Sequence, residues 1–223
     1  MSDNGALRLI VFDLDGTLID SRQDLADAAN ALIAERGGSP LPVEAVTGMV
    51  GEGAALLVRR ALSAAGLEPD LDTALPRFLE LYDERLLANT RLYPGTGEAL
   101  QAIAARATLA VLTNKPQRPT ETILRGLDVH RNFAHVVGGD TTFGRKPDPA
   151  GLRHLMGAVG ASAGETMLVG DSAIDLRTAR AAGVRVCLVK YGFGFPLAAA
   201  EIVGDVAIAE SPEELVAILR SRG

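Results

Sequence analysis

The sequence predicts an α/β protein whose Rossmann-like, doubly wound parallel sheet carries an inserted helical cap domain. Short apolar runs alternate with helical patterns over most of the chain, which is typical of strands buried on both faces of a parallel sheet. The alternation stops between residues 20 and 90, where only helical patterns occur. We therefore expect residues 1–19 and 91–223 to form the α/β core and residues 20–90 the cap.

Length and composition are those of a globular protein. The chain has 223 residues, of which 48% are hydrophobic and 22% charged, which excludes a disordered chain. The net charge of −6 disfavours nucleic-acid binding, because neutralising phosphates requires clustered Lys and Arg. No apolar stretch reaches the ~20 residues of a membrane helix, no signal pattern opens the chain, and Cys187 is the single cysteine. We expect a soluble, cytoplasmic protein that binds neither nucleic acid nor membrane.

The core elements follow in order along the chain. The expected strands cover residues 7–12, 108–112, 166–169 and 184–189 and, with a weaker pattern, residues 134–137 and 206–208. The expected helices between them cover residues 95–106, 117–126, 149–159, 173–182 and 212–221. Because strands and helices alternate, successive strands are expected to run parallel.

The inserted segment carries apolar residues at helical spacing but no strand-like run. The helical spacing occurs at residues 25–33 and 71–86, and an Ala- and Leu-rich segment at residues 53–66 lies between them. Pro94 and Gly95 then mark the return to the strand–helix alternation. We expect a helical insert between the first strand and the rest of the sheet.

Acidic and small polar residues follow the ends of several expected strands. They are Asp13, Asp15, Thr113, Asn114, Asp171 and Asp175, with Lys146 in a loop before a helix. In an open parallel sheet the carboxyl ends of the strands form the ligand-binding edge, so we expect these side chains to converge on one crevice. Four carboxylates repel one another, and one lysine does not neutralise them. Oxygen ligands of this kind predict a hard cation such as Mg²⁺.

Two neighbouring carboxylates beside Mg²⁺ can divide a phosphoryl-transfer reaction between them. One carboxylate can attack phosphorus and form an acyl phosphate. The other can give a proton to the leaving oxygen and later take one from water. Thr113, Asn114 and Lys146 are candidates for holding the phosphoryl oxygens as charge spreads over them.

Four segments together resemble the signature of the haloacid dehalogenase superfamily. They are Asp13-Leu14-Asp15-Gly16-Thr17-Leu18, Thr113-Asn114-Lys115-Pro116, Lys146-Pro147-Asp148-Pro149 and Gly170-Asp171-Ser172-Ala173-Ile174-Asp175. The resemblance covers nearly the whole chain and implies Asp13 as nucleophile and Asp15 as acid–base residue. It also implies that Mg²⁺ is held by Asp13, the Asp15 backbone carbonyl and Asp171, with Asp175 as an indirect or water-mediated partner.

Within the superfamily, the chain is most similar to the bacterial phosphoglycolate phosphatases. The supporting segments are Val50-Gly51-Glu52-Gly53, Tyr93-Pro94-Gly95, Lys115-Pro116, Gly138-Gly139-Asp140 and Tyr191-Gly192. This resemblance implies hydrolysis of 2-phosphoglycolate through an aspartyl phosphate, although Lys190 stands where a threonine is expected. The substrate's carboxylate calls for a further cation, for which Arg59, Arg60, Lys115 and Arg118 are candidates by residue type.

Other functions remain open at this stage. A phosphosugar mutase of the β-phosphoglucomutase type would use the same two aspartates, but residues 20–23 lack the histidine which that family places in its cap. A broad-specificity sugar or nucleotide phosphatase would share the whole mechanism. A non-catalytic phospho-acceptor switch is disfavoured by the chain's length and by an acceptor aspartate that follows the first strand. The substrate is expected to be a small phosphorylated metabolite, and the protein a monomer or homodimer.

Overall fold

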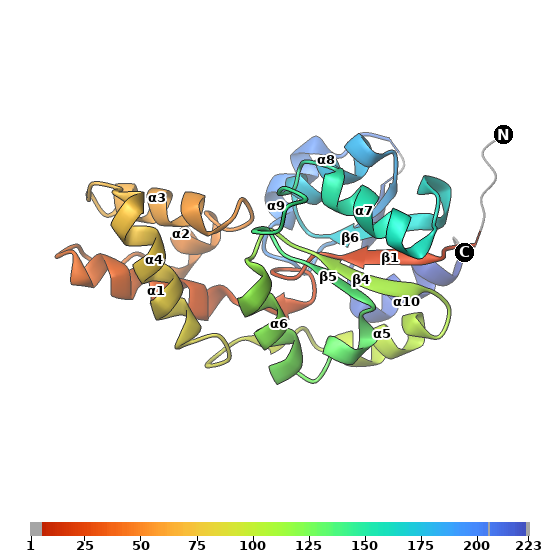
Figure 1. Cartoon of the computed structure of the whole chain (residues 1–223), viewed down its shortest axis with the longest axis horizontal. Coiled ribbons are helices and arrows are strands. Elements are labelled where there is room, and N and C mark those ends of the chain that lie inside the picture. Colours follow the sequence, from red (N-terminus) through yellow and green to blue (C-terminus); the bar gives the residue numbers. More distant parts are fainter. Residues whose placement is uncertain (1–5, 205, 222–223) are drawn as a thin grey trace.

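A six-stranded parallel sheet forms the centre of the larger part of the molecule (Figure 1). The computed structural model describes residues 6–204 and 206–221, and its sheet has the order β5-β4-β1-β6-β7-β8. The strands are β1 (Leu9–Phe12), β4 (Thr108–Leu112), β5 (His135–Val137), β6 (Thr166–Gly170), β7 (Arg185–Val189) and β8 (Ala207–Ala209). The chain extends the sheet from β1 first on one side and then on the other, which confirms the predicted doubly wound α/β fold.

Helices cover both faces of the sheet. They are α5 (Thr96–Ala104), α6 (Gln117–Gly126), α7 (Ala150–Val159), α8 (Ala173–Ala182), α9 (Phe195–Ala198) and α10 (Pro212–Ser221). Three short 3₁₀ helices lie at His130–Asn132, Ala163–Glu165 and Ala199–Glu201. In Figure 1, α7 and α8 lie on one face, and α5, α6 and α10 on the other. The sequence predicted all five of the longer helices but not α9, because four residues are too few for a periodic pattern.

The central strand is buried on both faces, as its unbroken apolar run predicts. Leu9 and Val11 pack in one apolar cluster with α7 and α8. Ile10 and Phe12 pack in the other cluster with α5, α6 and α10. Because successive side chains of a strand point to opposite faces, a strand between two helical layers needs apolar residues at every position.

Four helices stand apart from the sheet, beside one of its ends (Figure 1). They are α1 (Arg22–Glu35), α2 (Val43–Thr47), α3 (Ala54–Ala64) and α4 (Leu71–Asp83). The helical patterns of the sequence found α1, α3 and α4 but missed α2, which has only five residues. The division at residues 20 and 90 stays a prediction, and residues 1–5, 205 and 222–223 of the expected core lie outside the described residues. None of the helices in the described ranges has both the length and the apolar character needed to cross a bilayer.

Two short segments, where the chain enters and leaves these four helices, pair with each other. The strands β2 (Ile19–Asp20) and β3 (Arg91–Leu92) run antiparallel. The buried Asp24 carboxylate in α1 accepts hydrogen bonds from the backbone and side-chain groups of Asn89 and Thr90 at 2.7–3.0 Å. The two segments that connect the sheet with the four helices are therefore bonded to each other. This pairing was not predicted, because strands of two residues give no recognisable sequence pattern.

Candidate active site

The loop after β1 places Asp13 and Asp15 at the carboxyl end of the central strand. The backbone N–H of Asp13 still donates to Val169 O on β6 at 2.9 Å, so Asp13 lies at the edge of the sheet. The chain turns directly afterwards, and the carbonyl of Leu14 accepts from the N–H of Leu18 at 2.9 Å. This tight turn brings the second aspartate to the same end of the strand as the first.

Asp171 follows β6 and is held in place by this loop and by the segment after β7. Gly16 has φ +84°, in the left-handed region, and a Cβ on either Gly16 or Gly192 would overlap the Asp171 side chain. The carboxylate accepts from the Gly194 N–H at 2.7 Å and from Thr17 Oγ1 at 3.3 Å. No role at the site was predicted for Gly192 and Gly194, because two glycines so close together resemble no phosphate-binding loop. Their contact with Asp171 arises only when β6 and β7 pair.

Three carboxylates and one lysine are buried together at this edge of the sheet. Asp13, Asp171 and Asp175 each bring an oxygen within 4.8 Å of the other two. Lys146 Nζ lies 2.8 Å from Asp13 Oδ1 and 2.6 Å from Asp175 Oδ1. The other oxygen of Asp175 accepts from the backbone N–H and the hydroxyl of Ser172, at 3.1 and 2.6 Å. Both oxygens of Asp175 therefore have partners within the protein.

Burial and mutual repulsion set the protonation of this cluster. Burial raises the pKa of Asp13 to about 6, although Lys146 acts in the opposite direction. Burial, reinforced by Asp175 and Asp13, raises the pKa of Asp171 well above its ordinary value. Burial disfavours the Lys146 ammonium, but Asp13 and Asp175 outweigh it and raise its pKa above the ordinary value. Three carboxylates beside one lysine thus favour the uptake of a proton or a cation, because either relieves their repulsion.

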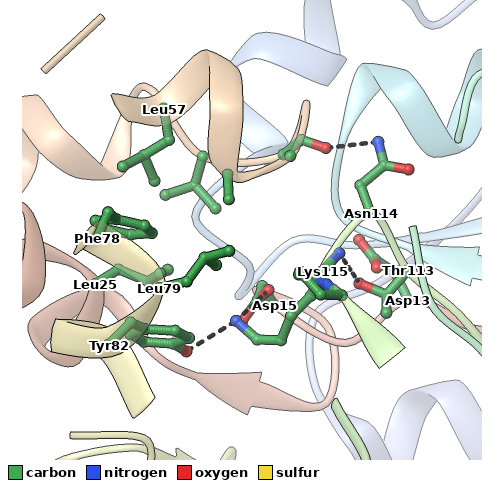
Figure 2. Close-up of a pocket in the computed structure, with 15 residues that line it drawn as sticks. Asp13, Asp15, Leu25, Leu57, Phe78, Leu79, Tyr82, Thr113, Asn114 and Lys115 are labelled. Carbon is green, nitrogen blue, oxygen red and sulfur yellow. Dashed lines mark hydrogen bonds and ion pairs between the residues drawn. The ribbon is translucent and has the colours of Figure 1, made fainter. Parts of the chain in front are cut away.

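The Asp15 carboxylate has different partners, which Figure 2 shows in part. Its Oδ1 accepts from Ser21 Oγ at 2.6 Å, and its Oδ2 lies 2.9 Å from Lys115 Nζ. Lys115 Nζ also donates to the Tyr82 hydroxyl at 2.8 Å. Lys115 follows β4 and Tyr82 belongs to α4, so these contacts connect the sheet with the separate helices. From the sequence, Tyr82 was expected only on the apolar face of a helix. The hydrogen bond of its hydroxyl was not predicted, because a hydropathy pattern does not register a phenolic oxygen.

A cavity of about 50 Å³ lies between the strand ends and the separate helices (Figure 2). Its polar side is formed by Asp13, Asp15, Thr113, Asn114 and Lys115. Its apolar side is formed by Leu25, Val50, Leu57, Phe78 and Leu79. A cavity of this size, with its charged groups at one side, suits a small ligand with a charged head group.

Thr113 and Asn114 both line the cavity, but their side chains form different hydrogen bonds. The Thr113 hydroxyl accepts from the Lys115 backbone N–H at 3.2 Å. The Asn114 amide donates to the carbonyls of Gly51 and Lys146, each at 2.9 Å, while its buried Oδ1 has no partner among the described residues. In this arrangement Asn114 ties the loop before α3 to the sheet. The contact of Asn114 with phosphoryl oxygens stays a prediction. To make it, the Asn114 amide would have to give up its hydrogen bond to Gly51 or to Lys146.

Of the four basic residues considered as partners of a substrate carboxylate, one lines the cavity and three do not. Lys115 lines the cavity, whereas Arg59, Arg60 and Arg118 do not. Arg60 instead pairs with Glu52 at 2.6 Å, and Arg118 forms an exposed ion pair with α4. The two arginines expected on α3 therefore do not face the cavity, because the helix turns its apolar residues toward it.

The sequence matches the family model of haloacid dehalogenase-like hydrolases over residues 10–189. The chain belongs to this family. The match contains Asp13, Asp15, Lys146 and Asp171, which the structure places together at the carboxyl ends of the strands. The superfamily resemblance expected from four short segments is confirmed over most of the chain.

Named relatives of this haloacid dehalogenase-like hydrolase agree with one another. A phosphoglycolate phosphatase of Rhodospirillum rubrum is 47% identical over 194 residues, which cover 83% of this chain and 80% of the relative. A plasmid-encoded phosphoglycolate phosphatase of Cupriavidus necator is 38% identical, covering 94% of this chain and 92% of the relative. The crystal structure described as a predicted phosphoglycolate phosphatase of Haemophilus somnus has a TM-score of 0.88 at 31% identity, covering 95% of this chain and 97% of its own.

Proposed function

We propose that this protein is a Mg²⁺-dependent phosphomonoesterase that hydrolyses 2-phosphoglycolate to glycolate and phosphate. One observation carries the proposal: Asp13 and Asp15 both line the same small cavity. Their carboxylates have different partners, Lys146 for Asp13 and Lys115 for Asp15. The relatives named phosphoglycolate phosphatase support the substrate. The cytoplasmic location and the oligomeric state, monomer or homodimer, stay predictions.

The buried carboxylates fit a hard divalent cation. Asp13, Asp171 and Asp175 offer oxygens close together, and their charge exceeds that of Lys146. We infer that Asp13, Asp171 and the backbone carbonyl of Asp15 hold Mg²⁺, which would balance negative charge on the carboxylates and the phosphoryl group. Asp175 has both oxygens committed to other partners, so its role is to orient Lys146.

In the first step, an oxygen of the Asp13 carboxylate attacks phosphorus. The phosphorus–oxygen bond to glycolate breaks, and the Asp15 carboxyl gives its proton to the departing oxygen. Glycolate and an aspartyl phosphate on Asp13 result. Lys146, 2.8 Å from Asp13, holds the nucleophile in position and provides positive charge where the phosphoryl charge develops.

In the second step, the Asp15 carboxylate takes a proton from a water molecule, which attacks the phosphorus of the aspartyl phosphate. The bond between phosphorus and the Asp13 oxygen breaks, so phosphate leaves and both aspartates return to their starting states. Ser21 and Lys115 hold the Asp15 carboxylate from its two oxygens and keep it aimed at one position throughout.

The test is steady-state phosphate release in the presence of Mg²⁺. We expect kcat/KM for 2-phosphoglycolate to exceed that for sugar phosphates, nucleotides and p-nitrophenyl phosphate by about a hundredfold or more. Asp13→Asn should lower kcat by at least about a thousandfold while the protein stays folded. Acid quenching during turnover should leave phosphate bound to the wild-type chain and none to the variant. Uniform weak activity on all substrates would contradict the proposed substrate, and full activity of Asp13→Asn would contradict the mechanism.

A further inference from the structure

We propose that Lys115 binds the carboxylate of the substrate and thereby selects phosphomonoesters that carry an anionic group next to the ester oxygen. The inference rests on the proposed phosphatase function and deepens it, since it names the residue that distinguishes a carboxylated substrate from an uncharged one. Three observations support it: the position of Lys115 in the cavity, its remaining hydrogen-bond capacity, and its distance from Asp15.

Lys115 supplies positive charge where the cavity has no other source of it. Among the described residues that line the cavity, it is the sole basic one, and it is 7% exposed. The opposite side carries apolar groups such as Leu57 and Phe78, which give a carboxylate no hydrogen bonds. A carboxylate that leaves water for such a cavity is stable only beside a cation or several donors. Lys115 is the group that meets this requirement.

The Lys115 ammonium has the capacity to bind one more acceptor. An ammonium carries three N–H donors. In this structure two of them have partners, namely Asp15 Oδ2 at 2.9 Å and the Tyr82 hydroxyl at 2.8 Å. The third has no hydrogen-bond partner among the described residues. A substrate carboxylate can therefore bind Lys115 without displacing either contact.

The position of Lys115 next to Asp15 sets which group of the substrate it can reach. The ester oxygen that Asp15 protonates must lie within hydrogen-bond distance of the Asp15 carboxyl. Lys115 Nζ is 2.9 Å from that same carboxyl, so the group it binds lies immediately beside the ester oxygen. In glycolate, one carbon separates the ester oxygen from the carboxyl carbon. The two neighbouring side chains thus match the spacing of a 2-phosphoglycolate ester.

The Lys115 ammonium is held between one oxygen from each part of the molecule. Asp15 Oδ2 lies 2.9 Å from its Nζ, and the Tyr82 hydroxyl lies 2.8 Å from it on the other side. Because Tyr82 belongs to α4 and Lys115 to the loop after β4, the lysine is fully positioned only when the two parts of the molecule are in contact.

The experiment compares two substrates in wild-type protein and in Lys115→Met, whose unbranched apolar side chain is of similar length. The substrates are 2-phosphoglycolate and 2-hydroxyethyl phosphate, which has a hydroxyl where the former has a carboxylate. We expect the variant to lose kcat/KM for 2-phosphoglycolate at least about thirtyfold more than for 2-hydroxyethyl phosphate. Arg118→Met, at an exposed side chain that does not line the cavity, is the control and should leave the ratio of the two substrates unchanged.

A binding measurement keeps the test independent of turnover. By calorimetry, wild-type protein should bind 3-phosphonopropionate, a non-hydrolysable analogue with the same spacing, at least about tenfold more tightly than propylphosphonate. Lys115→Met should abolish this preference, and Lys115→Arg, which keeps the charge, should retain part of it. If Lys115→Met does not fold, the arginine variant decides the matter on its own: it must show a changed but measurable preference for the carboxylated ligand.

The outcomes separate this inference from the proposed function. If wild-type protein hydrolyses 2-phosphoglycolate and Lys115→Met slows both substrates equally, the lysine acts only through Asp15 and the inference is overturned. If Lys115→Arg retains the full wild-type preference while Lys115→Met does not fold, the inference is also overturned. If wild-type protein hydrolyses neither ester with Mg²⁺ present, the proposed function fails instead.

Discussion

At the scale of single residues, the feature that distinguishes this site is the crowding of negative charge around Asp171. Its carboxylate contacts the loop after β1 and the Gly194 N–H, and both Gly16 and Gly192 leave room for it. Asp13 and Asp175 lie within 4.8 Å of it. Three carboxylates held this close repel one another, which favours a bound cation.

The metal site predicts a thermal shift. Adding Mg²⁺ at about a hundred times its Kd should raise the Tm of wild-type protein by roughly 5–10 °C, since binding adds about 2.7 kcal/mol to the free energy of unfolding. Asp171→Asn should show less than half of this shift, because the amide brings no charge to the ion. Differential scanning fluorimetry after EDTA treatment is the measurement.

A variant elsewhere on the surface controls for general effects of Mg²⁺ on this acidic chain. Glu68 is exposed and belongs neither to the cavity lining nor to the carboxylate cluster, so Glu68→Gln should keep the full wild-type shift. A wild-type protein whose Tm does not respond to Mg²⁺ would contradict the metal site.

At the scale of secondary-structure elements, the junction between the two parts of the molecule is organised by one buried carboxylate. Asp24, in the first turn of α1, accepts from Asn89 and Thr90 just before β3. Burial alone would raise the pKa of Asp24, but the hydrogen bonds from Thr90 and Asn89 outweigh it and lower the pKa below its ordinary value. The ionised form is therefore the one that joins α1 to the segment just before β3.

This junction predicts a pH-dependent loss of stability in Asp24→Asn. At pH 7 the variant should lose about 2–4 kcal/mol of unfolding free energy, because an amide cannot accept all the hydrogen bonds of the carboxylate. Since the folded pKa is the lower one, the wild-type advantage is present above the unfolded pKa of about 3.9 and is lost as pH falls through the folded pKa. Urea denaturation at pH 7 and at pH 3 measures both effects.

Asp27→Asn provides the matched control on the same helix. Asp27 is one turn further along α1, and its recorded side-chain partner is Gln23, at 2.8 Å. Its substitution should change the unfolding free energy by less than about 0.5 kcal/mol. An equal loss in both variants, or a loss in Asp24→Asn that persists unchanged at pH 3, would rule out the stated role for Asp24.

At the scale of the whole molecule, the separate helices contact the sheet through a few points around the cavity. The Gly51 carbonyl accepts from Asn114, Tyr82 binds Lys115, and α4 pairs with Arg118. Gly53 lies in the loop before α3 with φ +94°, and a Cβ there would come within 3.2 Å of the Arg145 guanidinium. The loop before α3 thus lies against the Arg145 side chain, and a side chain at position 53 would require the guanidinium to shift.

Two glycines that flank α3 allow the effect of this close approach to be separated from backbone strain. Gly53→Ala and Gly66→Ala each place a side chain at positive φ, which costs about 1–3 kcal/mol, but a Cβ on Gly66 would meet nothing within 4 Å. Both variants should therefore be destabilised, and Gly53→Ala by more, because φ +94° and ψ +164° at Gly53 are essentially restricted to glycine. Gly53→Ala alone should lower kcat/KM, by about tenfold, in assays well below either variant's Tm. Equal kcat/KM in the two variants would show that the contact of this loop with the sheet does not matter for activity.

Much of this organisation was predictable because its signals are local. Strands between two helical layers must be apolar at every position, so β1 and its neighbours stood out in the sequence. The helices α1, α3 and α4 have the length at which a periodic pattern emerges, whereas α2, β2 and β3 do not. Asp13 and Asp15 were recognisable because a turn directly after the central strand fixes where both residues lie.

By itself, then, the sequence determined the α/β fold, the inserted helices and the chemical types that gather at the strand ends. Only the tertiary structure decided which of these groups meet. Lys115 contacts Asp15 and Tyr82 because α4 brings Tyr82 to the loop after β4, while Arg59 and Arg60 lie on a face of α3 that does not line the cavity. The physical reason is that such contacts join residues far apart in the chain, and their geometry depends on how complete elements pack.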